Sequence, residues 1–195
     1  MEKLNRNEKL TLLRLAREAL ESSVHGKALP PVVQSELTIP LQEDGASFVT
    51  LTINGKLRGC IGALTPYQPL YQDVREHSVA AALQDYRFSP VRPSELSHIL
   101  VEVSRLTTPQ ALIYQQPADL LASLQPRRDG VILIDGSRRA TFLPQVWAQI
   151  PVKEEFLGHL CAKMGAPTNL WKQKHIDVQL YQVEEFNELD QAPES

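Results

Sequence analysis

The stretch ASFVTLTINGKLRGCIGAL, residues 46–64, decides the expected fold. Two runs rich in β-branched and aliphatic residues flank Asn54-Gly55, a dipeptide that tolerates positive φ at both central positions of a type I′ turn. The pattern therefore predicts a β-hairpin, and its two-residue turn sets the register of the two strands. The expected cross-strand pairs are Ile53 with Lys56, Leu51 with Arg58 and Val49 with Cys60.

Arg58 and Cys60 come from one face of this expected hairpin, because residues two apart on a strand point the same way. A nearby guanidinium favours the thiolate, which is the form of cysteine that acts as a nucleophile or metal ligand. Gly59 and Gly62 would leave the backbone bare for a ligand. Cysteine is also among the most often buried residues, and glycines in strands often mark bulges, so a core position for Cys60 stays an alternative.

An arginine among aliphatic neighbours needs an anion, which can be an internal carboxylate, a ligand or water at an edge. A thiol enzyme also needs a base, and His77 lies on the helix expected directly after the hairpin. The place of His77 on an apolar stripe is more typical of a core histidine. The internal carboxylates considered for Arg58 are Asp73, Glu76 and Asp85.

No zinc-binding motif of the C-x-x-C, H-x-x-x-H or H-E-x-x-H type occurs in the sequence. His159 and Cys161 are two residues apart on an expected helix, about 200° around its axis, so they cannot chelate one ion. Cys161 also belongs to the apolar stripe of that helix, which favours a core position. We therefore expect neither a metal nor a cofactor.

The rest of the chain alternates between helical and strand patterns. Residues 7–25 predict a helix with Asn7 as its N-cap, and residues 28–44 a proline-rich linker. Hairpin connections outnumber long crossovers, which favours an α+β fold: a mainly antiparallel sheet with flanking helices, in one domain over residues 1–195 with two lobes sharing one core. Further helices are expected at 68–85, 117–124, 144–150 and 151–167, and strands at 98–106 and 175–186. A second hairpin is expected at 129–143 around Asp135-Gly136, with Ser137 as a residue that can lengthen its turn.

The composition is that of a soluble globular protein, with 43% hydrophobic and 22% charged residues and a formal net charge of -3. No basic tract predicts nucleic-acid binding. Charges interrupt every apolar run near the N-terminus, so we expect neither a signal peptide nor a membrane span. A cytoplasmic protein with two reduced cysteines is the resulting expectation.

Five segments that follow one another along the chain carry a family resemblance. They are LRGCIG at 57–62, DYRFSPV at 85–91, DGVIL at 129–133, FLPQVW at 142–147 and FLGHLCAKMGAP at 156–167. Together they resemble the motifs of the AMMECR family, whose prokaryotic members are called AmmeMemoRadiSam system protein A. The first helix and the proline-rich linker carry less of this resemblance.

The resemblance implies a cytosolic α+β protein without an established reaction. It also implies two partners, a Memo-like protein and a radical SAM enzyme, in a system acting on an unknown small-molecule or peptide substrate. The chain would be either an enzyme component with a site at the LRGCIG motif or a non-catalytic binding or scaffold subunit. The residues that match the family motifs are Cys60 and Arg58 as the catalytic candidates, with Gly59, Gly62, Asp85, Arg87 and Phe88 as the ligand-binding candidates.

Overall fold

The computed structural model describes residues 3–190, which fold into helices and antiparallel sheets, as the sequence predicts. The chain divides into two compact units. Unit 1 contains Met1–Thr108 and Glu184–Ser195, and unit 2 contains Pro109–Val183. Each unit has its own hydrophobic core, so two clusters replace the single core that the sequence predicted for two lobes.

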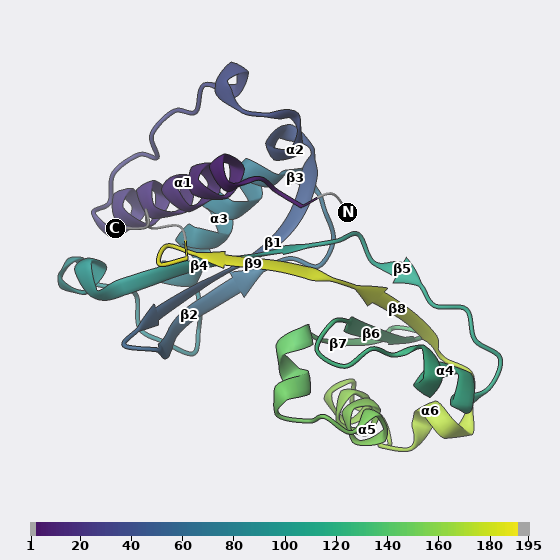
Figure 1. Cartoon of the computed structure of the whole chain (residues 1–195). Coiled ribbons are helices and arrows are strands. Elements are labelled where there is room, and N and C mark those ends of the chain that lie inside the picture. The colour runs from purple at the N-terminus through teal and green to yellow at the C-terminus, as the bar shows by residue number, and fades with distance from the viewer. Residues whose placement is uncertain (1–2, 191–195) are drawn as a thin grey trace. The chain divides into compact units, whose positions relative to one another are not determined.

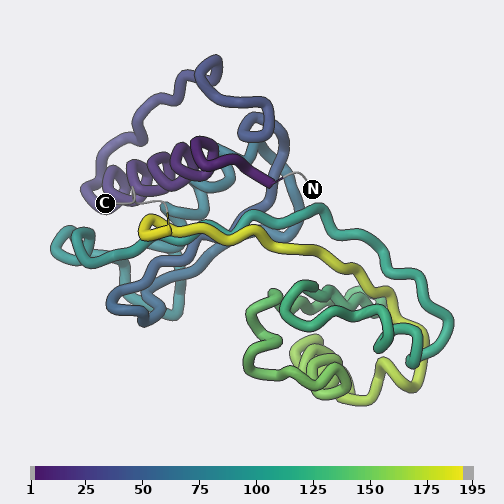
Figure 2. Tube along the Cα trace, in the orientation of Figure 1, coloured from purple at the N-terminus to yellow at the C-terminus, as the bar shows by residue number. Residues whose placement is uncertain are grey.

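Unit 1 places two helices on one face of a sheet whose strand order is β2-β1-β4-β9, with β3 paired to β1 (Figure 1). Its elements are α1 (Arg6–Val24), η1 (Gln34–Glu36), α2 (Ile39–Gln42), β1 (Asp44–Ile53), β2 (Lys56–Gly62), β3 (Gln68–Pro69), α3 (Leu70–Leu83), η2 (Pro93–His98), β4 (Ile99–Leu106) and β9 (Val183–Asn187). Strands β4 and β9 lie side by side although they are far apart in the sequence (Figure 2). Alternate residues of β1 and β4 are fully buried against α1 and α3.

Helix α1 begins one residue earlier than the sequence predicts. Asn5, not Asn7, is its N-cap: the Asn5 side chain accepts from the Glu8 N–H at 3.0 Å, and the Glu8 carboxylate accepts from the Asn5 N–H at 2.7 Å. This reciprocal capping box satisfies two N–H groups that a helix end otherwise leaves without partners. The expected linker at 28–44 contains the short helices η1 and α2, and its last residue begins β1.

The first hairpin has the expected turn but a different register. Asn54 and Gly55 have φ values of 51° and 74°, and Ile53 pairs with Lys56 as predicted. The pairing then shifts by one residue at a β-bulge, so the predicted pairs of Leu51 with Arg58 and Val49 with Cys60 are wrong. The pairs beyond the bulge are Leu51 with Gly59, Thr50 with Cys60 and Val49 with Ile61.

The bulge brings Gly59 to the sheet face that α3 covers. A Cβ built on Gly59 would overlap the main-chain oxygen of Ala81 in α3. Only glycine lets the strand and helix backbones approach this closely. The register therefore depends on a contact with a helix that follows later in the chain.

Unit 2 contains a sheet with the strand order β5-β8-β6-β7. Its elements are β5 (Gln110–Ala111), α4 (Pro117–Ser123), β6 (Gly130–Asp135), β7 (Arg138–Phe142), η3 (Pro144–Ala148), α5 (Lys153–Lys163), α6 (Leu170–Gln173) and β8 (Asp177–Tyr181). Its core includes Trp147, whose ring stacks on Phe156 with centroids 3.5 Å apart. Residues 144–150 contain a 3-10 helix where the sequence predicted a helix.

Two predictions for this unit need correction. The second hairpin closes with Asp135 opposite Arg138, so Ser137 belongs to the turn, as the sequence allowed, while Asp135 is the last paired residue of β6 and not a turn residue. The single final strand expected at 175–186 is two strands, β8 and β9, which belong to different sheets. Gln182 lies between them, and a period-two pattern cannot show that a strand changes sheets.

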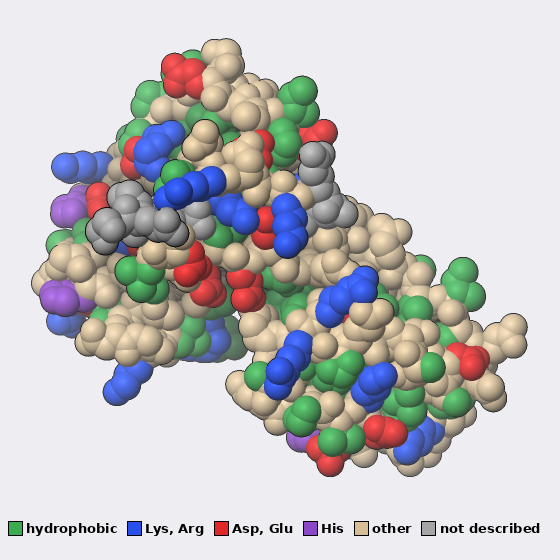
Figure 3. Space-filling view, in the orientation of Figure 1, with side chains coloured by type: hydrophobic (Ala, Val, Ile, Leu, Met, Phe, Trp, Pro, Cys, Tyr) green, Lys and Arg blue, Asp and Glu red, His purple; other side chains and the backbone are tan. Residues whose placement is uncertain are grey.

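On the face drawn in Figure 3, the basic and acidic side chains are interspersed. This distribution agrees with the small net charge of -3. Within residues 3–190, no helix combines the length and the apolar character that crossing a membrane would require.

Gly59→Ala tests the contact between β2 and α3. The new Cβ would meet the main chain of the helix, so we expect the free energy of unfolding to fall by about 2 kcal/mol or more. Gly158→Ala on α5 is the control, because its Cβ would lie 3.4 Å from the nearest atom and alanine favours a helix. Urea unfolding followed by circular dichroism measures both variants. A midpoint for Gly59→Ala equal to that of the wild type would contradict the packing argument.

Candidate functional site

The peptide groups of Cys60 are held from outside the sheet by two side chains. Cys60 lies on β2, which is an edge strand of its sheet. Its N–H donates to Oδ2 of Asp85 at 2.9 Å, and its carbonyl accepts from Nη2 of Arg87 at 3.1 Å. Edge strands otherwise present such groups without partners. The two side chains therefore take the place of a neighbouring strand at this residue.

Asp85 and Arg87 are also bonded to each other. Nε of Arg87 donates to Oδ1 of Asp85 at 2.9 Å, and Nη2 donates to Oδ2 at 2.7 Å. The Asp85 side chain is 2% exposed. The hydrogen bonds from Arg87 hold the pKa of Asp85 well below its usual range, although burial acts in the opposite direction. The carboxylate in turn raises the pKa of Arg87, so both groups are charged at neutral pH.

The thiol of Cys60 is half-buried and accepts a hydrogen bond from Oγ1 of Thr50 at 3.3 Å. The hydrogen bonds that Arg87 donates to Asp85 are the largest cause of the raised pKa of Arg87, and burial opposes them. The charges of Asp85 and then of Cys60 raise this pKa further. Arg87 is therefore the guanidinium that interacts electrostatically with the thiol. Thr50 was not among the sequence-predicted residues, because the expected register placed Val49 opposite Cys60.

Arg58 does not share the surroundings of Cys60. Its Nε donates to Oε1 of Glu95 at 2.7 Å, and its Nη2 donates to Oε2 at 3.1 Å. This bidentate pair, in which Arg58 is 14% exposed, lowers the pKa of Glu95. The predicted pairing of Arg58 with Leu51 is wrong, because Arg58 is the extra residue of the bulge. Arg58 and Cys60 have different side-chain partners, Glu95 and Thr50.

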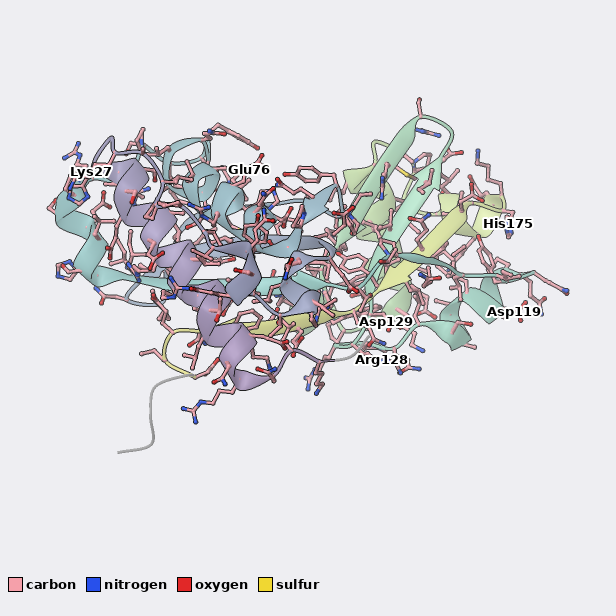
Figure 4. The ribbon with its side chains drawn as sticks, turned by 90° about the horizontal axis from the view of Figure 1, so that it is seen from above. Lys27, Glu76, Asp119, Arg128, Asp129 and His175 are labelled. Atoms are coloured by element: carbon pink, nitrogen blue, oxygen red, sulfur yellow. The ribbon has the colours of Figure 1, made fainter. Side chains whose placement is uncertain are left out.

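The three carboxylates that the sequence suggested for Arg58 have other partners. Asp85 binds Arg87, and Asp73 accepts from the Ser47 hydroxyl at 2.6 Å. Glu76, labelled on the helix layer in Figure 4, accepts from the Gln68 amide at 2.7 Å. The actual partner, Glu95, follows Arg92-Pro93 on η2, where no local sequence signal links it to a strand so far away.

The two glycines of the motif are packed against the chain itself. Gly59 lies against Ala81, and a Cβ on Gly62 would overlap the Phe48 ring and the Ser47 carbonyl. Close packing therefore accounts for the absence of side chains at both positions. Their role in binding a ligand stays a prediction.

A cavity of about 330 Å³ adjoins the motif. It is lined by Arg58, Phe88, Ser89, Arg92, Ser94 and Glu95. The structure thus brings Arg58 and Phe88 to one cavity, whereas Cys60, Asp85 and Arg87 do not line it. Phe88 connects the two groups, because its ring lies 5.5 Å from the guanidinium carbon of Arg87.

The remaining candidates occupy core or surface positions. Nδ1 of His77 lies 3.1 Å from Oδ2 of Asp73, and both side chains are buried. Cys161 is fully buried, and burial raises the pKa of its thiol. His159 is exposed. Among residues 3–190, no three His, Cys, Asp or Glu side chains lie close enough together to hold a metal ion.

Sequence reasoning missed one carboxylate in line with the thiol, Glu102, and a second that interacts with it, Glu185. Thr50 pairs with Cys60 on one side and with Glu102 of β4 on the other, so thiol, hydroxyl and carboxylate form a row across three strands. Burial raises the pKa of Glu102, and the charge of Asp190 raises it further. Glu185 of β9 has a pKa raised by burial and by the charge of Glu102. Glu102 gives no signal in the sequence beyond its alternation with buried valines.

Comparison with known proteins identifies relatives over more than nine tenths of the chain. The AMMECR1 family model matches residues 13–186. A protein from Methanothermobacter thermautotrophicus is 38% identical over 95% of this chain and 96% of its own length. Protein MJ0810 from Methanocaldococcus jannaschii is 35% identical, covering 91% and 89% of the two chains. The crystal structure of the uncharacterized protein PH0010 from Pyrococcus horikoshii superimposes with a TM-score of 0.85 at 34% identity, covering 96% and 94%.

Asp85→Asn tests the bonds that hold Cys60. The variant replaces a buried charged acceptor, so we expect a loss of about 2 kcal/mol in the free energy of unfolding at neutral pH. Because the folded-state pKa of Asp85 is depressed, its stabilisation is present above the ordinary value of 3.8 and is lost as the pH falls below it.

The difference between Asp85→Asn and the wild type should therefore shrink in urea unfolding experiments at about pH 3. The exposed Asp44 provides the control, and Asp44→Asn should change stability little at either pH. A difference that stays constant between the two pH values would show that the charge of Asp85 is not what stabilises the fold.

Proposed function

Because this chain belongs to the AMMECR1 family, we propose that it is the thiol-bearing component of a cytosolic AmmeMemoRadiSam-type system. One observation carries the proposal: Cys60 accepts a hydrogen bond from Thr50 while Asp85 and Arg87 hold both of its peptide groups. A nucleophile or metal ligand that the fold already holds in position loses no conformational entropy at the moment of reaction, which favours the reaction. The site is built to fix one thiol.

The proposed chemistry is that of a thiolate acting on an electrophilic small molecule or peptide. A hydroxyl that donates to sulfur and a cation nearby both interact favourably with negative charge on the sulfur atom. Thr50 and Arg87 supply these two groups. Arg58, whose charge is balanced by Glu95, has a separate role at the cavity.

In this proposal the partners are a Memo-like protein and a radical SAM enzyme, which would act with this chain on one substrate. Support for these partners comes from the family motifs alone. The reaction is a property of the system, and this chain contributes a positioned sulfur to it.

A non-catalytic binding or scaffold role is the second candidate. It is favoured by the surroundings of the thiol, since none of the histidines within residues 3–190 forms a hydrogen bond with Cys60, and His77 is directed to Asp73. A thiol nucleophile normally has a base within reach. As a scaffold, the chain would present a substrate or dock against its partners, and Cys60 would be dispensable.

Alkylation of the native protein with iodoacetamide tests the proposal. We expect Cys60 to be labelled, and Cys161, which is 0% exposed, to be labelled only after denaturation. Thr50→Val should slow the labelling of Cys60 several-fold, because the hydroxyl no longer supports charge on sulfur. Peptide mass spectrometry identifies the labelled residue. Failure to label Cys60 in the folded protein would remove the proposed nucleophile.

Cys60→Ser separates the two candidates once the partner proteins are combined with this chain. If Cys60→Ser abolishes the activity of the combined proteins while Cys161→Ser retains it, the thiol role is supported. Retained activity with Cys60→Ser supports the scaffold role. A pull-down with this chain that recovers neither partner would count against both forms of the system.

A further inference from the structure

The cavity of about 330 Å³ beside Phe88 is surrounded by more cationic than anionic groups. Arg58 and Glu95 line it as a bidentate pair, so their charges compensate each other. Glu95 is further occupied, because its Oε2 accepts from the N–H of Arg92 at 2.8 Å. Both carboxylate oxygens of Glu95 therefore already accept hydrogen bonds from residues that line the cavity.

Arg92 supplies the excess positive charge. Among residues 3–190 it forms no ion pair, although its charge is one of the minor causes that lower the pKa of Glu95, after the hydrogen bond from Arg58. The hydroxyls of Ser89 and Ser94 line the same cavity, and neither forms a hydrogen bond with another described side chain or peptide group. One guanidinium and two hydroxyls therefore line one cavity without a hydrogen bond to the described residues.

Phe88 gives the cavity an apolar wall. Its side chain is half-buried, and the guanidinium of Arg87 lies against its ring. Binding sites for small molecules typically combine such apolar surface with a few placed polar groups in volumes from about 300 Å³. A cavity of this size suits a small ligand.

We propose that this cavity binds the oxyanion of a small carboxylated or phosphorylated molecule. Arg92 and the hydroxyls of Ser89 and Ser94 donate to the oxyanion, and charge-assisted bonds of this kind are the strong ones. The apolar part of the ligand contacts Phe88. Arg58 is held by Glu95 and lines the same cavity.

This site is independent of the thiol chemistry, because Cys60 does not line the cavity. Cys60→Ser should bind an anionic probe as the wild type does. Loss of probe binding and loss of Cys60 labelling are therefore separate results.

Titration of the full chain with phenyl phosphate, benzoate, inorganic phosphate and neutral benzyl alcohol tests the proposal. We expect saturable amide shifts for the non-proline residues of 88–95 in two-dimensional NMR at low salt, with phenyl phosphate or benzoate but not with benzyl alcohol. The comparison of the two aromatic anions identifies which oxyanion is preferred. Tighter binding of phenyl phosphate than of inorganic phosphate supports the role of Phe88, and equal affinity overturns it.

Arg92→Gln should weaken the affinity for the anions about tenfold or more. Arg139→Gln is the matched control, since Arg139 is also an exposed arginine but lies on β7 of unit 2. The proposal is overturned by the absence of saturable shifts with every anion, by unchanged affinity in Arg92→Gln, or by an equal loss in Arg139→Gln.

Discussion

The hydrogen bond from the Cys60 N–H to the buried carboxylate of Asp85 is the constraint on which the site depends. A buried charge is stable only when paired and hydrogen-bonded, and Asp85 meets this condition through Arg87, which also reaches the Cys60 carbonyl. The segment after α3 is thereby fixed to the edge of the sheet at the peptide groups of the thiol residue. Side-chain bonds at this edge also occupy groups that could pair with the strand of another molecule.

The two candidate functional side chains of the LRGCIG motif, Arg58 and Cys60, lie in different surroundings, and the β-bulge is at Arg58. Gly59 must face α3, so the residue before it leaves the regular ladder and binds Glu95, while Cys60 faces Thr50. One six-residue motif thus contributes a cation to a cavity and a sulfur to a row of polar groups. A bulge commonly redirects a side chain in this way, and here it takes Arg58 out of the regular pairing that the sequence predicted for it.

Local signals made the turn at Asn54-Gly55, the helices and the α+β class predictable, because each depends on residues close in sequence. The register was not predictable, since it depends on Gly59 meeting a helix that follows later. The family motif singled out Asp85 and Arg87, but their bonds to a peptide group appear only in three dimensions. Thr50 was missed because the predicted register was wrong. Glu95 was missed because it is far from Arg58 in the sequence.

The division of the chain has a consequence for its biosynthesis. Unit 2 is one uninterrupted stretch, whereas unit 1 needs residues from both sides of it. Phe186 of β9 fills part of the unit 1 core, and Glu188 accepts from Nε of Arg17 on α1 at 2.8 Å. A ribosome releases these residues only after all of unit 2 has emerged, while domains generally fold in the order of synthesis. Unit 1 must therefore wait, with the position of its last strand open, until all of unit 2 has been synthesised.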